Sequence, residues 1–140
     1  MKRMSVIGAV VWLVATSVSA LADPINIVGT WKGEATAVHR GANPYRPTEG
    51  SEPNLPSQAL EFTFVIKQQQ GNRFVGTSSS GTKTETIIGA LMNDGAGGIM
   101  LDDDGQYILN VIDPTTIEAC YNHSNPEGKV VACYTLKRQR

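Results

Sequence analysis

The sequence predicts an all-β domain, and three observations favour an eight-stranded antiparallel up-and-down barrel. Apolar and polar residues alternate with a period of two in segment after segment, which is typical of strands with one buried face. Glycine, asparagine and proline separate these segments at short intervals, so hairpins connect them. No segment has the apolar spacing of a long helix, and closure removes the exposed edges of an open sheet. The alternative is a two-sheet β-sandwich.

Residues 1–22 have the pattern of a secretory signal peptide. A basic start and an apolar stretch at 6–14 precede Ala20 and Ala22, the small residues that a signal peptidase requires. We therefore expect cleavage before Asp23 and a secreted or periplasmic protein with no integral membrane span after cleavage, a retained N-terminal anchor being the alternative. The remaining 118 residues (140 minus 22) fit one domain, 23–140.

The charge and the cysteines of this domain limit its partners and its compartment. Removal of Lys2 and Arg3 from the 12 basic residues leaves ten against 13 acidic residues, a formal net charge of −3. We expect no nucleic-acid partner, because such partners need a clustered basic face. Both cysteines, Cys120 and Cys133, lie in the exported part, where a disulfide persists.

The first strand is expected at 27–35. It places Trp31 on one face, among smaller residues of the same parity, with glycine on either side at Gly29 and Gly33. Glycine within a strand often marks a sharp bend or a close approach of two backbones. The indole is therefore expected to plug a tightly curved sheet.

Residues 39–58 are expected to form a long connection over one mouth of the fold. Four prolines in this stretch remove hydrogen-bond donors and fix φ, which excludes a helix or a central strand. Connections of this length in a compact domain are usually functional or disordered, and both alternatives stay open.

Seven further strands complete the expected barrel. The clearest covers 60–67, where four apolar residues alternate strictly with their neighbours. Residues 93–98 form a loop, and Asp102, Asp103 and Asp104 form a solvated hairpin tip that lacks the ligand spacing of an EF-hand, so no metal site is assigned. The strands are expected at 60–67, 73–78, 83–91, 99–101, 106–111, 115–121 and 129–137.

The last hairpin carries a prediction about the cysteines. If Ala119 opposes Tyr134 in the antiparallel pair, large residues face small ones across the strands, and Cys120 faces Cys133 on the outer side. Facing positions lie close enough for a disulfide. A bulged turn at Gly128 would shift the register by one residue and send the cysteines to opposite faces. We expect the disulfide.

Two short stretches carry a resemblance to a known superfamily. Gly29-Thr30-Trp31 on a first strand after a signal peptide, with Arg138 on the last strand, resembles the calycins, which include the lipocalins and the avidins. The resemblance implies an eight-stranded barrel that Gly29, Trp31 and Arg138 close at one end. It implies a fold and names no ligand.

Eight inward-facing side chains are the candidates for ligand contacts. In a filled barrel they are simply core, whereas in a barrel with a cavity the tyrosine hydroxyls would orient a mostly apolar ligand. The eight are Trp31, Phe62, Phe64, Phe74, Tyr107, Tyr121, Tyr134 and Arg138.

The sequence thus predicts an exported barrel that binds or sequesters a small apolar or aromatic ligand without a cofactor. The alternative is a periplasmic protein-binding module, such as a protease inhibitor, that inserts residues 23–26 or 39–58 into another exported protein. His39 and His123 are expected at strand ends or in loops, and no nucleophile motif accompanies them. We therefore assign no catalytic residue and do not expect an enzyme.

Overall fold

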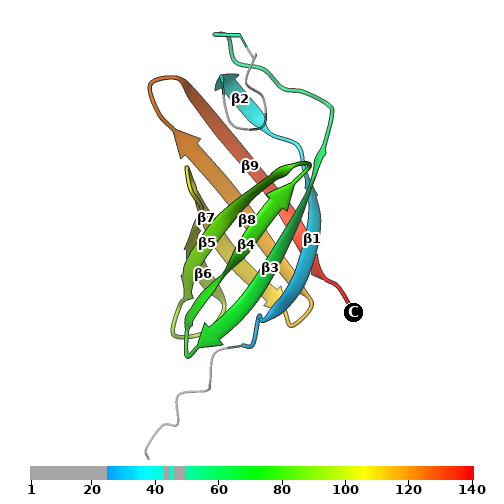
Figure 1. Cartoon of the computed structure of the whole chain (residues 1–140), viewed down its shortest axis with the longest axis vertical. Coiled ribbons are helices and arrows are strands. Elements are labelled where there is room, and N and C mark those ends of the chain that lie inside the picture. Colours follow the sequence, from blue (N-terminus) through cyan, green and yellow to red (C-terminus); the bar gives the residue numbers. More distant parts are fainter. Residues whose placement is uncertain (1–24, 43–44, 46–49) are drawn as a thin grey trace, which may run out of the picture.

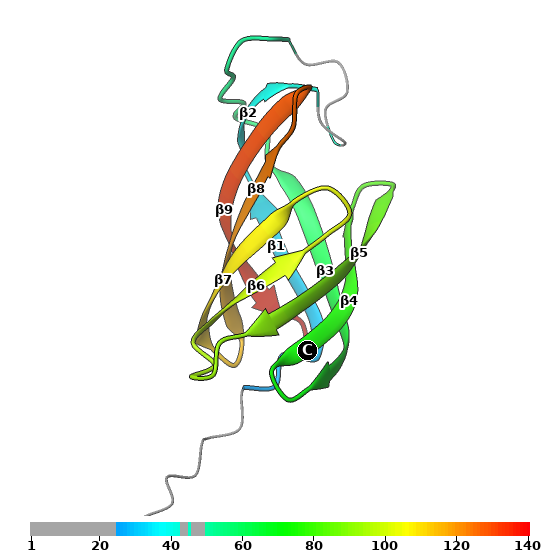
Figure 2. The same ribbon diagram turned by 90° about the vertical axis from the view of Figure 1, so that its left-hand side faces the viewer.

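The computed structural model describes residues 25–42, 45 and 50–140, which form a closed antiparallel β-barrel with one extra strand (Figures 1 and 2). These residues contain no helix, and hence none that could cross a membrane. The expected signal peptide lies outside the described residues, as do residues 23–24 and six residues of the 39–58 connection. The strands are β1 (Gly29–Ala35), β2 (Val38–Gly41), β3 (Leu60–Gln70), β4 (Arg73–Ser80), β5 (Lys83–Leu91), β6 (Gly97–Leu101), β7 (Gln106–Asp113), β8 (Thr116–Ser124) and β9 (Gly128–Arg138).

Eight of these strands form the barrel, which confirms the predicted architecture and excludes the β-sandwich. β1 pairs with β3, and each strand from β3 to β9 pairs with the next one along the chain. The barrel closes where β9 pairs with β1, with Trp31 opposite Arg138. At this closure the backbones approach closely, because a Cβ on Gly33 would collide with the carbonyl oxygen of Thr135. This close approach is what the glycines of the first strand predict.

β2 corrects the predicted start of the long connection. Val38 pairs with Val131 and Gly41 with Gly128, so β2 continues along β9 in the same register as β1. The backbones of His39 and Asn54 also exchange two hydrogen bonds, of 3.1 and 2.8 Å. The expectation of a loop from residue 39 was wrong because β9 extends beyond β1 and offers its free backbone groups to residues that precede the prolines.

The start of β6 also differs from the prediction. β6 begins at Gly97, within the expected loop at 93–98, since Gly97 and Gly98 pair with β7. The backbone of β5 passes so close to Gly98 that a Cβ there would meet the carbonyl oxygen of Ala90. Glycine here is therefore a packing requirement of the sheet as well as a turn signal.

The last hairpin has the predicted register. Ala119 lies opposite Tyr134, and Cys120 opposite Cys133. The two cysteines form a disulfide whose Cα atoms are 4.0 Å apart. The alternative with a bulged turn is excluded, because it would have separated the two sulfurs.

Candidate ligand site

One end of the barrel interior is closed by Trp31 and Arg138. The Trp31 side chain is fully buried, and its Nε1 donates a hydrogen bond to the carbonyl oxygen of Ile27 at 2.9 Å. The Arg138 guanidinium lies 4.7 Å from the centre of the indole ring, in range for a cation–π interaction. It also donates a hydrogen bond to the carbonyl oxygen of Asn26.

Tight packing surrounds this closed end. The space among the side chains is only about 10 Å³, which is room for at most one water molecule. Phe64 and Phe74, two of the predicted ligand contacts, border this space and are almost fully buried. The structure therefore places four of the eight predicted site residues (Trp31, Phe64, Phe74 and Arg138) in or over packed core.

A larger cavity lies toward the opposite end, where β2 extends the barrel. Its volume is about 40 Å³. The other four predicted site residues border it, and so do all four tyrosines of the chain. The described residues that line it are Ala35, Ala37, His39, Tyr45, Leu60, Phe62, Tyr107, Tyr121, Val130, Ala132 and Tyr134.

Aromatic rings contact one another around this cavity. The ring centre of Phe62 lies 5.4 Å from that of Tyr45 and 5.6 Å from that of Tyr134. The rings of Tyr107 and Tyr121 are 4.8 Å apart. The strand alternation positions four of these five rings, whereas Tyr45 reaches the cavity from the proline-rich connection.

His39 is the unusual member of the lining. Only 3% of it is exposed, and neither ring nitrogen has a hydrogen-bond partner among the described residues. Buried polar side chains are usually hydrogen-bonded, because an unpaired polar group has lost its water without compensation. An imidazole in this position is therefore able to accept a hydrogen bond from a molecule in the cavity or to donate one to it.

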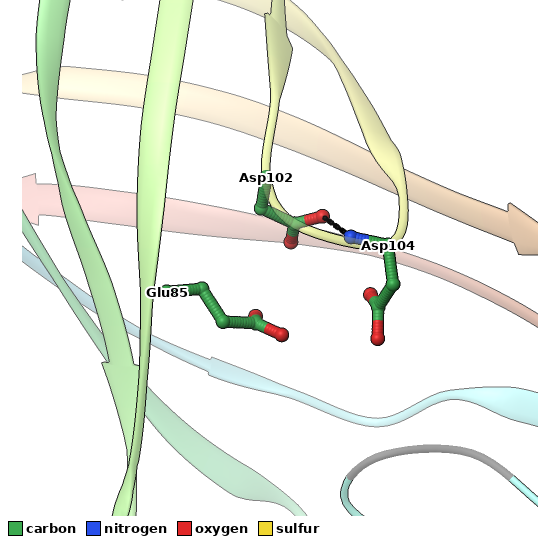
Figure 3. Close-up of side chains that lie close together, drawn as sticks. All are labelled: Glu85, Asp102 and Asp104. Atoms are coloured by element: carbon green, nitrogen blue, oxygen red, sulfur yellow. Dashed lines mark hydrogen bonds between the residues drawn. The ribbon is translucent and has the colours of Figure 1, made fainter.

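Three carboxylates meet beside the cavity (Figure 3). Glu85 projects from β5 while Asp102 and Asp104 project from the β6–β7 hairpin, and their oxygens lie within 4.8 Å of one another. Two cavity tyrosines contact this cluster: Tyr45 donates a hydrogen bond to Glu85 at 2.7 Å, and Tyr121 donates one to Asp104 at 2.8 Å. The carboxylates thus form a second layer behind the tyrosine rings.

This arrangement corrects the expectation of a solvated hairpin tip. Asp103 is exposed, but Asp102 and Asp104 are half-buried. Asp102 accepts a hydrogen bond from the backbone N–H of Gly105 at 2.7 Å, which folds the hairpin so that the acidic side chains turn toward Glu85. The sequence pattern missed this fold because it depends on the strand next to the hairpin.

Lys83 lies among the carboxylates and compensates part of their charge. Its Nζ is 2.7 Å from Glu85 and 3.6 Å from Asp104. Partial burial lowers the pKa of Lys83, but the hydrogen bond and the charge of Glu85 outweigh burial and raise that pKa above its ordinary value. Three carboxylates with one ammonium carry a formal charge of −2. Carboxylates grouped in this way are able to ligate a divalent cation, but here the lysine ammonium is the cation in contact with Glu85 and Asp104.

The negative charge affects the groups around it. Burial raises the pKa of Asp102, and the nearby charges of Glu85 and Asp104 add to that rise. Burial also raises the pKa of every tyrosine in the cavity wall above its ordinary value of 10.0, and the charge of Asp102 contributes at each of the four. The field of the carboxylates therefore reaches the cavity.

Both histidines lie next to a strand end, as expected, since His39 is the second residue of β2 and His123 the last but one of β8, but both are buried. His123 lies in β8, where its Nδ1 contacts the carbonyl oxygen of Asp104. Its Nε2 has no partner among the described residues. Because its Nδ1 faces the acidic hairpin, His123 helps to hold that hairpin rather than lining the cavity.

Several residues of this end were missed by the sequence prediction. Glu85 lies on the same face of β5 as Ile87 and Leu91, because side chains alternate along a strand. This pattern could have predicted that its carboxylate lies inside the barrel. His39 lay hidden in the stretch expected to be a loop. No periodic signal could have found Tyr45, because it belongs to no strand.

Comparisons with known proteins add a fold likeness. No protein-family model matches the chain, and no curated protein is significantly similar to it. One similar solved structure is a protein of unknown function from the DUF3598 family of Nostoc punctiforme PCC 73102, with 15% identity and a TM-score of 0.46 over 83% of this chain. This chain spans only 50% of that protein. Another is the S-type phycobiliprotein lyase CPES from Guillardia theta, with 9% identity and a TM-score of 0.36 over 81% of this chain and 89% of the lyase. Neither likeness carries an inference about function.

Proposed function

We propose that this protein binds a small organic molecule in the tyrosine-lined cavity, with no covalent chemistry. The observation that carries the proposal is His39, a buried side chain that faces the cavity with neither ring nitrogen partnered by a described residue. Most of the remaining lining is apolar or aromatic, and a few polar groups among apolar walls are typical of small-molecule sites.

The size of the cavity limits what enters it. Small-molecule pockets commonly measure roughly 300–1,000 Å³, whereas this one measures about 40 Å³. We infer that one apolar or aromatic group of a few non-hydrogen atoms enters the barrel. The rest of a larger ligand then lies toward the mouth, near the half-buried Leu60 and Val130.

We also propose that the protein is exported and is a distant calycin-like barrel. The charge and hydropathy pattern of residues 1–22 supports export, and the disulfide between Cys120 and Cys133 fits an oxidising compartment. The contact between Trp31 and Arg138 across the closing strands supports the calycin-like assignment.

Native mass spectrometry tests the binding proposal. The protein is purified from the periplasm, and we expect a bound small mass that leaves on denaturation. Ala132→Leu extends a side chain into the cavity and should abolish the adduct, whereas Ala90→Leu, on the exposed outer face of β5, should keep it. Nuclear magnetic resonance titration with phenol provides a second measurement, with shifts expected at the cavity residues.

Two outcomes would contradict the proposal. The first is a bare protein that also shows no phenol-induced shifts at the cavity. The second is an adduct that survives Ala132→Leu, because the ligand would then lie elsewhere. A co-purifying protein in place of a small mass would favour the alternative of a protein-binding module.

A further inference from the structure

The cavity is next to an excess of negative charge. The side chain of Glu85 is only 1% exposed, and it shares one cluster with Asp102 and Asp104. Lys83 is the one cation within 4 Å of these carboxylates among the described lysines and arginines, and it leaves the cluster at a formal charge of −2. A partly buried cluster of this sign attracts cations and repels anions, and solvent screens it less than a fully exposed one.

The aromatic walls of the cavity also favour cations over anions. A ring face is negative, so a cation near it is attracted, as in the aromatic cages that hold quaternary ammonium groups. Tyr45 and Tyr121 donate their hydroxyl hydrogens to carboxylates, which makes their rings richer in electrons and leaves those hydroxyls no hydrogen for an anionic ligand. The protein's own ammonium already uses one such ring, because Nζ of Lys83 lies 5.1 Å from the centre of the Tyr45 ring.

His39 supplies the group that orients a ligand. A neutral imidazole has one acceptor nitrogen, and this side chain has no partner for either nitrogen among the residues that the structure describes. An alkylammonium ion has an N–H to donate and methyl or methylene groups to place against alanine and valine side chains. The cavity offers an acceptor, apolar contacts and a negative field together.

We propose that the cavity selects a small organic cation, the ammonium group of an alkylamine, whose N–H is donated to His39 while its charge is held by the aromatic rings and the carboxylates behind them. This inference rests on the proposed function and adds the chemical class of the ligand. A volume of about 40 Å³ holds roughly three spheres the size of water, so trimethylammonium, with four non-hydrogen atoms, is a suitable probe.

The test compares three probes at pH 7 by nuclear magnetic resonance titration of the folded protein. Trimethylammonium carries the charge, whereas tert-butanol has the same three methyl groups and one hydrogen to donate but no charge and one more non-hydrogen atom. Acetate carries the opposite charge. We expect trimethylammonium to bind about tenfold more tightly than tert-butanol, as cation–π and carboxylate attraction together predict. Acetate should not bind.

Charge-removing variants locate the source of the preference. Asp102→Asn keeps the oxygen that accepts from Gly105, and Glu85→Gln keeps the shape of the side chain. Each should weaken trimethylammonium binding by about three- to tenfold while leaving tert-butanol unchanged. The matched control is Glu61→Gln, an exposed residue paired with Lys32 on the outer face, which should change binding by less than about twofold.

The outcomes separate this inference from the proposed function. Equal binding of trimethylammonium and tert-butanol, or preferential binding of acetate, would overturn the cation inference while the cavity remained a ligand site. Unchanged trimethylammonium binding in a folded Asp102→Asn or Glu85→Gln variant would overturn it as well. If no probe bound and phenol did not bind either, both proposals would fail.

Discussion

Both ends of the barrel have a contact between a cation and an aromatic ring, but the contact has a different role at each end. At the closed end the Arg138 guanidinium lies 4.7 Å from the Trp31 ring, and the strand pairing of β1 with β9 holds both residues in place. At the cavity end the Lys83 ammonium lies 5.1 Å from the Tyr45 ring, beside carboxylates that it only partly neutralises. A cation against an aromatic ring completes the packing at one end and leaves charge and space at the other.

The buried polar atoms differ in the same way. The indole N–H of Trp31 has its partner in the carbonyl oxygen of Ile27. His39, at the other end, has no hydrogen-bond partner in the part of the chain that the structure describes. Natural proteins depart from complete packing and hydrogen bonding mainly at functional sites. The contrast indicates that the closed end contributes stability, and it supports the proposed recognition role of the cavity end.

The largest effect is expected from Trp31→Ala at the closed end. The side chain is fully buried, and removal of a core tryptophan commonly costs about 3–5 kcal/mol in the free energy of unfolding. Urea denaturation measures this loss. Leu55→Ala is the control, because Leu55 is 82% exposed and should change stability by less than about 0.5 kcal/mol. A loss at Trp31 no larger than the control's would mean that this end does not hold the barrel together.

Loss of the disulfide is expected to have the next largest effect. Replacing both Cys120 and Cys133 by alanine should lower the free energy of unfolding by about 2–3 kcal/mol, because the bond closes a short loop across β8 and β9. Wild-type protein in reducing agent should show the same loss, and the variant should be insensitive to the reagent.

The two ends are expected to unfold together, so Trp31 fluorescence and tyrosine circular dichroism should report one common transition. Separate transitions would show that the two ends unfold as separate units.

Two glycine substitutions compare the packing of the ends directly. A Cβ on Gly89 would collide with the ring of Phe74, and a Cβ on Gly105 would collide with the ring of Tyr121. The interior space that Phe74 borders is only about 10 Å³, so Gly89→Ala should cost about 1–3 kcal/mol. Tyr121 can move into the cavity, so Gly105→Ala should cost less, about 1 kcal/mol or below. Equal losses in thermal or urea unfolding would contradict the difference in packing.

Alkaline titration examines the cavity end alone, because all four tyrosines lie there. Burial raises the pKa of each above its ordinary value of 10.0. The folded protein therefore keeps these protons when the unfolded chain loses them, and stability is full below about pH 10 and falls as the pH rises further. Tyrosinate absorbance of the folded protein should begin at least about one pH unit above that of the protein in urea. Overlapping titrations would mean that water reaches the tyrosines freely.

The alternation of apolar residues was enough to predict which side of most strands faces the core, and hence the barrel. In β6 it was not, because Ile99 and Leu101 are exposed and Met100 is buried. It was also enough for the register of the last hairpin, since large and small residues face each other only when Cys120 faces Cys133. Local pattern decides both features. The start of the long connection was predicted wrongly at His39, because its pairing depends on how far β9 extends, which no local pattern contains.

The candidate site was predicted only in part for a related reason. Phe62 and three tyrosines follow from strand parity, but a cavity depends on the summed volumes of side chains from several strands. The cluster of Glu85 with Asp102 and Asp104 joins a strand to a hairpin whose tip turns inward. A run of three aspartates predicts a solvated turn unless the neighbouring strand is known to present a half-buried lysine beside the turn.

Asp102→Asn is expected to have the smallest effect on the free energy of unfolding. The sign of this effect is the most informative about the difference between the two ends. Burial raises the pKa of Asp102 above its ordinary value of 3.8. The folded protein then binds a proton that the unfolded chain has lost, so stability is full below about pH 3.8 and decreases as the pH rises through the folded pKa. The variant should be more stable than the wild type at pH 7, by less than about 1 kcal/mol because the group is partly exposed.

At pH 3, below both pKa values of Asp102, the gain from Asp102→Asn should disappear, and parallel urea denaturation at the two pH values measures the difference. The same substitution should weaken the binding of trimethylammonium. A charge that destabilises the empty barrel at neutral pH but strengthens binding is best explained as part of the recognition site. An equal change in stability at both pH values would instead point to altered hydrogen bonds in the hairpin. It would contradict the inference that the charge of Asp102 destabilises the empty barrel at the cavity end.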